Sequence, residues 1–182
     1  RKGFITITGE IGTGKTTLCR LLLNRLDKKI KTSLIFNPNL TTIELLQAIN
    51  QDFGIESKSI SKKELVDALN TFLLLVLKKG DNAVLIIDEA QNLTPECLEE
   101  VRMLSNLETD RDKLLQIILV GQPELRKKLE LERLKQLNQR IALRYHLEPF
   151  DPKEAKAYIL HRLKIAGGDD KVFFTQQAVD KV

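Results

Sequence analysis

The stretch Gly9-Glu10-Ile11-Gly12-Thr13-Gly14-Lys15-Thr16 fits the phosphate-loop pattern GxxxxGK[ST] at every required position. A β-branched and aromatic run from Phe4 to Thr8 precedes it and predicts a strand. Apolar residues at helical spacing follow it from Thr17 to Leu26 and predict a helix. Strand, glycine loop and helix are the context that this motif requires. A simple glycine turn is therefore the weaker interpretation.

The loop offers several groups that bind an anion. Its glycines let the backbone curl so that successive N–H groups point inward, and the helix N-terminus adds the positive end of its dipole. The Lys15 ammonium would reach the β- and γ-phosphates of a nucleotide, and the Thr16 hydroxyl would coordinate Mg²⁺. The predicted nucleotide-binding residues are Gly9, Glu10, Ile11, Gly12, Thr13, Gly14, Lys15, Thr16 and Thr17.

A second motif lies in the middle of the chain. The continuous apolar run Ala83 to Ile87 is typical of a strand buried in a parallel sheet. It is followed by Asp88 and Glu89, at the end of the strand where ligand sites of open α/β sheets lie. Asp88 would hold Mg²⁺, directly or through water, and Glu89 would accept a proton from water attacking the γ-phosphate. The pair could instead cap the next element, but together with the phosphate loop it favours ATP hydrolysis.

Apolar patterns and turn residues predict the remaining elements. The predicted strands are 33–36, 114–120 and 141–147, and the predicted helices are 42–53, 61–79, 95–107, pieces of 123–137, 152–166 and one that begins at Thr175. Ser61 and Glu64 predict a capping box. The added leucines Leu73, Leu74, Leu75 and Leu77 predict that the end of that helix is buried all round.

Strands and helices alternate through Leu147, which predicts an α/β fold with a parallel sheet covered by helices on both faces. Only helices are predicted after Pro149. We therefore expect a P-loop core in residues 1–148 and the beginning of a small helical lid domain in residues 149–182. Because Arg1 runs directly into a predicted core strand, we expect the chain to be part of a longer protein.

Composition excludes few classes of function. The formal net charge of +4 and the pI near 9.0 permit binding to DNA or anionic lipid without favouring it. The longest apolar run, Phe72 to Leu77, is far too short to span a bilayer. Cys19 and Cys97 lack metal-binding spacing, so we expect buried, reduced thiols in a cytoplasmic protein.

Four segments together resemble the AAA+ ATPases and, within them, the general secretion pathway protein A family of bacterial secretion ATPases. The segments are 7–18, 87–93, 118–125 and 137–141. AAA+ regulators of DNA transposition share a looser version of these motifs. The resemblance covers nearly the whole chain and implies an AAA+ fold.

The resemblance also implies roles for single residues. Gln122 lies where such proteins carry the first sensor, near the γ-phosphate and the attacking water, although it could be a turn residue. Asn37 lies where a polar residue restrains the catalytic glutamate, although an Asn-Pro turn explains it equally well. Arg140 lies where the arginine finger for a neighbouring subunit is expected, with Arg144 as the fallback and a surface salt bridge as the alternative for both.

The expected activity is therefore hydrolysis of MgATP, with Glu89, Lys15, Gln122 and Arg140 as the catalytic set. The resemblance implies a homo-oligomer formed on nucleotide binding, secretion-machinery proteins as partners, and membrane contact only through segments outside the chain. The usual adenine-side segment and the second sensor arginine would also lie outside it. Alternatives are a DNA-linked AAA+ regulator and a scaffold that binds ATP but hardly cleaves it. A small-molecule kinase is less favoured, because the Asp-Glu pair suits water activation better.

Overall fold

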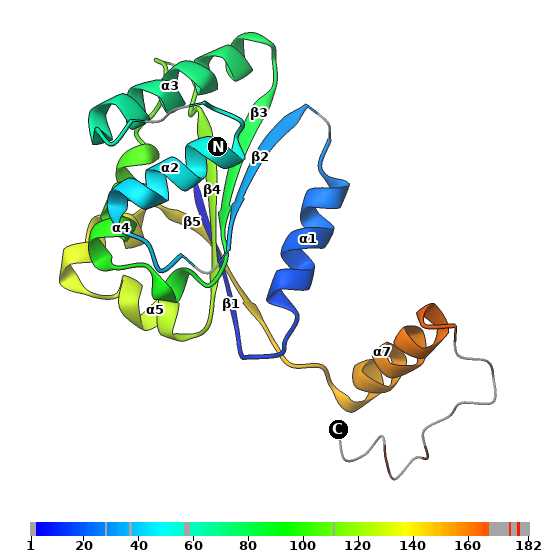
Figure 1. Ribbon diagram of the computed structural model, residues 1–182. Coiled ribbons are helices and arrows are strands. Elements are labelled where there is room, and N and C mark those ends of the chain that lie inside the picture. The colour runs from blue at the N-terminus through cyan, green and yellow to red at the C-terminus, as the bar shows by residue number, and fades with distance from the viewer. Residues whose placement is uncertain are drawn as a thin grey trace. The chain divides into compact units, whose positions relative to one another are not determined.

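The structure is a computed structural model of the chain (Figure 1). It describes residues 3–27, 29–36, 38–56, 59–110, 112–167, 175 and 178. The chain divides into two compact units, Arg1–Leu147 and Glu148–Val182.

The first unit is built on a sheet of five parallel strands in the order β2-β3-β4-β1-β5. The strands are β1 (Phe4–Gly9), β2 (Ile30–Ile35), β3 (Asn82–Ile87), β4 (Leu115–Gly121) and β5 (Ile141–Leu147). The predicted parallel sheet is confirmed. Strand β2 begins three residues before the predicted start, because an edge strand is only partly covered and needs no continuous apolar sequence.

Helices cover both faces of this sheet. They are α1 (Lys15–Arg25), α2 (Thr42–Asp52), α3 (Lys62–Lys78), α4 (Pro95–Leu104), α5 (Glu124–Leu129) and α6 (Lys135–Gln139), with 3-10 turns η1 (Ala90–Asn92) and η2 (Glu132–Leu134). Helix α1 lies on one face, and α2, α3, α4 and α5 lie on the other (Figure 1). Each face has its own apolar core: a large one under α2 to α6 and a smaller one under α1.

Helix α2 begins and ends as its sequence predicts. The Thr41 hydroxyl accepts a hydrogen bond from the backbone N–H of Glu44, and the Glu44 carboxylate accepts one from the N–H of Thr41, which is a complete capping box. Just past the helix, Gly54 has a φ of 76°, a left-handed conformation that glycine adopts without strain. Helix α4 likewise has the predicted Thr94 cap and Pro95 at its first position.

Two predictions for α3 are wrong. Its N-cap residue Ser61 makes no side-chain capping bond. Instead, Ser59 Oγ accepts from the Ser61 N–H and donates to Glu64 Oε2 at 2.6 Å. Ser59 therefore binds the Glu64 carboxylate, which in a capping box would accept from the backbone N–H of Ser61. The end of α3 is also not buried all round, since Leu74 and Leu75 are 41% and 54% exposed. A single layer of helices covers this face, so only the inward stripe of α3 is buried.

The second unit contains α7 (Pro152–Ile165). Asp151 caps it in a capping box with Glu154. None of the residues of α7 is buried within the described part of the chain. The helix predicted from Thr175 onward falls mostly outside the described residues, and the assignment of this unit as a lid remains a prediction.

The sequence predicts buried, reduced thiols at both cysteines. Cys19 and Cys97 are both buried and free, as predicted.

Across the residues that the structure describes, there is no helix with the length and apolar character needed to cross a membrane.

We expect Thr41→Ala to destabilise the fold by about 1 kcal/mol, because it removes the hydroxyl that caps α2. Hydrogen bonds from the backbone and side chain of Thr41 lower the pKa of Glu44. The stabilisation from these hydrogen bonds is fully present above the pKa that Glu44 has in the unfolded chain. It is lost as the pH falls through the lower pKa that Glu44 has in the folded chain. Urea unfolding should therefore show a difference between wild type and Thr41→Ala that shrinks as the pH falls from about 6 to about 3.

Thr71→Ala is the matched control, since Thr71 is an exposed threonine inside α3 that donates only to the carbonyl of Asp67. Its effect should stay within about 0.5 kcal/mol. Equal effects of the two substitutions near neutral pH would show that the cap contributes nothing.

Candidate nucleotide-binding site

The phosphate loop joins the carboxyl end of β1 to the start of α1. Gly12 and Gly14 have φ values of 85° and 87°, and Gly14 is the N-cap residue of α1. Gly9 is required for a different reason, because a Cβ there would lie 2.7 Å from the Leu147 carbonyl oxygen and 2.8 Å from Thr13 Oγ1. The loop backbone therefore depends on all three glycines.

Lys15 is buried within this loop, with 6% of its surface exposed. Its Nζ donates to the carbonyl oxygens of Gly9 at 2.9 Å and Glu10 at 2.8 Å. These contacts hold a cation under the loop at the start of α1. An ammonium has three N–H donors, so the arrangement leaves one donor for an anion bound by the loop.

The two sequence motifs meet at Thr16 and Asp88. Thr16 Oγ1 donates to Asp88 Oδ2 at 2.6 Å, and Asp88 Oδ1 accepts from the backbone N–H of Glu89 at 2.9 Å. Asp88 is only 1% exposed, so these hydrogen bonds offset the cost of burying its charge. Hydroxyl and carboxylate oxygens are the ligand types that Mg²⁺ prefers, so this pair fits the predicted metal position.

Glu89 has an unusual backbone. Its φ of 53° and ψ of 37° make it the only non-glycine residue with positive φ in the part of the chain that the structure describes. Such conformations cost about 1–3 kcal/mol and are concentrated at functional sites. The Glu89 carboxylate accepts hydrogen bonds from the side-chain amides of Gln91 at 2.5 Å and Gln122 at 3.3 Å.

A cleft of about 320 Å³ lies over the loop. Its walls are formed by Ile11, Gly12, Gly14, Lys15, Thr16, Thr17, Glu89 and Gln122. The structure thus brings the predicted base and sensor to the phosphate loop. Hollows of about 430 and 550 Å³ lie elsewhere on the first unit, but neither includes a residue of the loop.

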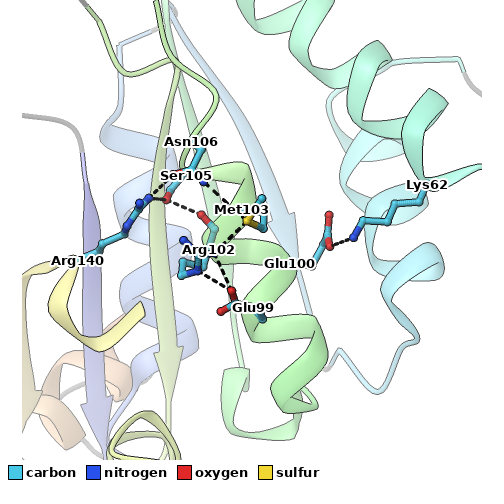
Figure 2. Close-up of polar contacts among 8 residues, drawn as sticks. All are labelled: Lys62, Glu99, Glu100, Arg102, Met103, Ser105, Asn106 and Arg140. Atoms are coloured by element: carbon cyan, nitrogen blue, oxygen red, sulfur yellow. Dashed lines mark hydrogen bonds and ion pairs between the residues drawn. The ribbon is translucent and has the colours of Figure 1, made fainter. Parts of the chain in front are cut away.

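The two candidate arginines lie away from this cleft within their own chain. Arg140 directly precedes β5, whose first residue pairs with Phe4 at the amino end of β1. Its guanidinium donates to Ser105 Oγ at 2.9 Å and to Asn106 Oδ1, at the end of α4 (Figure 2). Arg144 donates to the carbonyl and side-chain oxygens of Asn138 at 2.8 and 2.7 Å. These partners are neutral, so neither contact is the surface salt bridge considered as an alternative.

Asn37, the predicted restraint on the catalytic glutamate, lies outside the described residues. The contacts of Glu89 instead lead to a residue that sequence reasoning missed. Gln91 Oε1 accepts from the backbone N–H of Gln122 at 3.1 Å while its amide nitrogen contacts Glu89. Its signals in the sequence were its place two residues after Glu89 and its position in the segment 87–93 that resembles the family.

Cys19 lies on the α1 side of the same region. Burial, and secondly the negative charge of Asp88, raises the pKa of its thiol to about 11. The thiol is therefore protonated at neutral pH and is a poor nucleophile. Cys19 acts as a packing residue of the smaller core beneath the loop.

The geometry agrees with what sequence comparison finds. Residues 1–129 match the family described as AAA domain. The chain belongs to the AAA domain family. AAA domains are P-loop proteins that bind nucleotides, which agrees with a phosphate loop and an acidic pair at one edge of the sheet.

One relative matches most of this chain. General secretion pathway protein A of Aeromonas hydrophila is 45% identical over 172 residues, which is 94% of this chain. The predicted resemblance to that protein is confirmed. The alignment includes 31% of the relative, so the chain spans about a third of that protein's length.

Solved structures share the fold of this AAA domain. The Aeropyrum pernix ORC2 protein, solved with ADPNP and ADP, has a TM-score of 0.72 and 18% identity, covering 90% of this chain and 46% of its own. Domain III of the Thermotoga maritima replication initiation protein DnaA has a TM-score of 0.56 and 20% identity, covering 100% of this chain and 68% of its own. At these identities the likeness shows the fold alone.

We expect Gly9→Ala to destabilise the AAA domain by about 1–3 kcal/mol, because the added Cβ would collide with the backbone of β5 and with the Thr13 hydroxyl. Gly3→Ala, at the other end of the same strand segment, is the control. Its Cβ would meet its nearest atoms at 3.7 and 3.8 Å, an ordinary contact. Thermal unfolding should separate the two variants, and equal stability would contradict the close approach at Gly9.

Proposed function

We propose that the chain binds MgATP in this cleft and hydrolyses it to ADP and inorganic phosphate. The observation that supports this most directly is the Thr16–Asp88 hydrogen bond, which joins two motifs that are 72 residues apart in the chain. The same contact brings Glu89 to the wall of the cleft that Lys15 and the loop form. The pairing of a phosphate-binding loop with a carboxylate base is what water-mediated phosphoryl transfer requires.

Each part of the cleft has a proposed role. Loop N–H groups and Lys15 bind and orient the phosphates, while Thr16 and Asp88 would hold Mg²⁺, which neutralises charge on the phosphate oxygens. Glu89 accepts a proton from the attacking water as the water oxygen bonds to the γ-phosphorus. The bond from that phosphorus to the bridging oxygen breaks, and ADP leaves. Gln122 contacts Glu89 and the cleft, and so acts as the sensor.

Arg140 requires a second copy of the chain to take part. It lies at the amino ends of the parallel strands, whereas the loop lies at their carboxyl ends. Among the residues that the structure describes, no arginine lines the cleft of its own chain. We propose that nucleotide binding assembles a homo-oligomer in which Arg140 reaches the γ-phosphate bound by a neighbour.

We further propose that this ATPase acts in the assembly or regulation of a bacterial secretion or export machinery, on its cytoplasmic side. The identity to General secretion pathway protein A supports this role. Contact with the membrane would come from segments outside the chain. The alternative of a DNA-linked regulator rests on the mildly basic charge, which permits DNA binding, and on the looser likeness to AAA+ regulators of DNA transposition.

Two substitutions separate binding from hydrolysis. We expect Lys15→Ala to lose ATP binding, because it removes the cation under the loop. Glu89→Gln should keep ATP affinity and lower turnover by about 10²–10⁴-fold, because the amide accepts no proton. Fluorescent-nucleotide titration and phosphate release measure the two effects.

Matched controls are Lys31→Ala on the edge strand β2 and Glu124→Gln on α5, both at exposed positions away from the cleft. Both controls should bind and hydrolyse ATP as the wild type does. Normal hydrolysis by Glu89→Gln would exclude Glu89 as the base. Binding without single-turnover hydrolysis in the wild type would favour the nucleotide-gated scaffold.

A mixing experiment tests Arg140. We expect Arg140→Ala and Lys15→Ala each to be inactive alone, and a mixture of the two to recover part of the activity. In the mixed oligomer, an intact cleft on the first variant receives Arg140 from the second. Loss of such a finger lowers turnover by about 10³–10⁵-fold. Absence of recovery in a mixed oligomer confirmed by mass would exclude action in trans, and the same mixture with Arg144→Ala tests the fallback.

A further inference from the structure

We propose that Gln91 is a positioning residue that holds the Glu89 carboxylate and Gln122 in one fixed arrangement at the cleft. This inference rests on the proposed ATP hydrolysis, since it concerns the geometry of its base. Gln91 does not line the cleft, whereas Glu89 and Gln122 do. Its effect on the reaction would therefore pass through these two side chains.

The side-chain amide of Gln91 uses both of its ends. Its nitrogen donates to Glu89 Oε2 at 2.5 Å, and its oxygen accepts from the backbone N–H of Gln122 at 3.1 Å. The Gln122 side chain closes the cluster by donating to the same Glu89 oxygen at 3.3 Å. The base at the end of β3 and the sensor at the end of β4 are thus joined through one amide.

Packing fixes the position of this amide. A Cβ on Gly121 would lie 2.5 Å from Gln91 Oε1, so the amide lies directly against the backbone of β4. Lys128 Nζ, from α5, donates to the carbonyl oxygens of Gln91 and of Leu93, the latter at 2.9 Å. The backbone of Gln91 is therefore held from one side by α5, and its side chain from the other side by β4.

The need for such a support follows from the backbone of Glu89. A glutamate side chain has several rotatable bonds, and the left-handed conformation at Glu89 turns the chain sharply just after β3. Without the Gln91 donor, Oε2 would keep the longer hydrogen bond from Gln122, at 3.3 Å, and the carboxylate would be held less firmly in one rotamer. A displacement of about 1 Å in a reacting group can lower a rate by about 10²-fold.

Only an amide can serve both neighbours here. A glutamate at this position would keep the acceptor for the Gln122 N–H but would face the Glu89 carboxylate with a like charge. A methionine would keep much of the volume and lose both hydrogen bonds. Gln91→Met and Gln91→Glu therefore remove the donor to Glu89 in two different ways.

The experiment measures ATP affinity and turnover of the full chain carrying Gln91→Met or Gln91→Glu. We expect turnover to fall by about 10- to 100-fold in both variants. The Kd for ATP should change by less than about twofold, because the interaction that is lost supports the transition state and not binding. Circular dichroism and thermal unfolding establish that each variant is folded.

Gln116→Met is the matched control. Gln116 lies near the amino end of the same strand β4, where its amide also bridges to a neighbouring strand through the N–H and carbonyl of Gly3. The same substitution there removes these two hydrogen bonds and a longer one to the carbonyl of Ile117, and Gln116 does not line the cleft. It should lower stability and leave turnover unchanged.

A double variant separates positioning from general damage. In the Glu89→Gln background the base is already absent, so adding Gln91→Met should cause no further loss of residual hydrolysis. A further tenfold loss there would overturn the inference, because Gln91 would then act independently of Glu89.

The outcomes also distinguish this inference from the proposed function. If the wild type hydrolyses ATP and a folded Gln91→Met or Gln91→Glu variant keeps wild-type turnover, the inference fails and the proposed function stands. If the wild type binds ATP but releases no phosphate even in a single turnover, the proposed function fails, and the inference fails with it.

Discussion

The hydrogen bond from Thr16 to the buried carboxylate of Asp88 is the contact on which the rest of the site depends. It ties the first turn of α1, and with it the phosphate loop, to the end of β3. A carboxylate that is 1% exposed is stable there only because a hydroxyl and a backbone N–H donate to it. The same charge helps to keep the Cys19 thiol protonated. The loop, the acidic pair and the proposed metal position between them are therefore one connected structure.

The parallel sheet explains why these groups meet. Strands β3, β4 and β1 are neighbours in the sheet order, and their carboxyl ends lie at the same edge. Each strand contributes one part: β3 is followed by the acidic pair, β4 by Gln122 and β1 by the phosphate loop. The proposed roles of these residues all follow from this shared edge. Arg140 lies at the amino ends of the strands, which is why its proposed role as an arginine finger involves a second copy of the chain.

Rigidity is concentrated around Glu89. Its backbone is left-handed, and its carboxylate is held by two amides from neighbouring elements. The glycine at the end of β4 leaves room for one of these amides, and a lysine from α5 holds the turn that carries it. This is the arrangement expected of a general base that has to keep one position while the nucleotide and a neighbouring subunit come and go.

Much of this protein could be predicted from its sequence because the determining signals are local. The glycine loop and the apolar run before Asp88 each depend on residues close together in the chain, so spacing and residue type were sufficient. Helix α3 was predicted less well. The exposure of Leu74 and Leu75, and the pairing of Glu64 with Ser59, depend on which helices cover the sheet and on which partner a side chain reaches first.

The contacts of the site belong to the tertiary structure. Gln91 lies in the segment 87–93 that resembles the family, but nothing in that segment shows its contact with Gln122, which is 31 residues away. What the folded chain adds for Arg140 is its set of partners, Ser105 and Asn106 at the end of α4. The sequence by itself determined the AAA fold, the phosphate loop and the acidic pair. Only the folded chain decided which side chains hold Glu89, because that depends on contacts between strands that are distant in sequence.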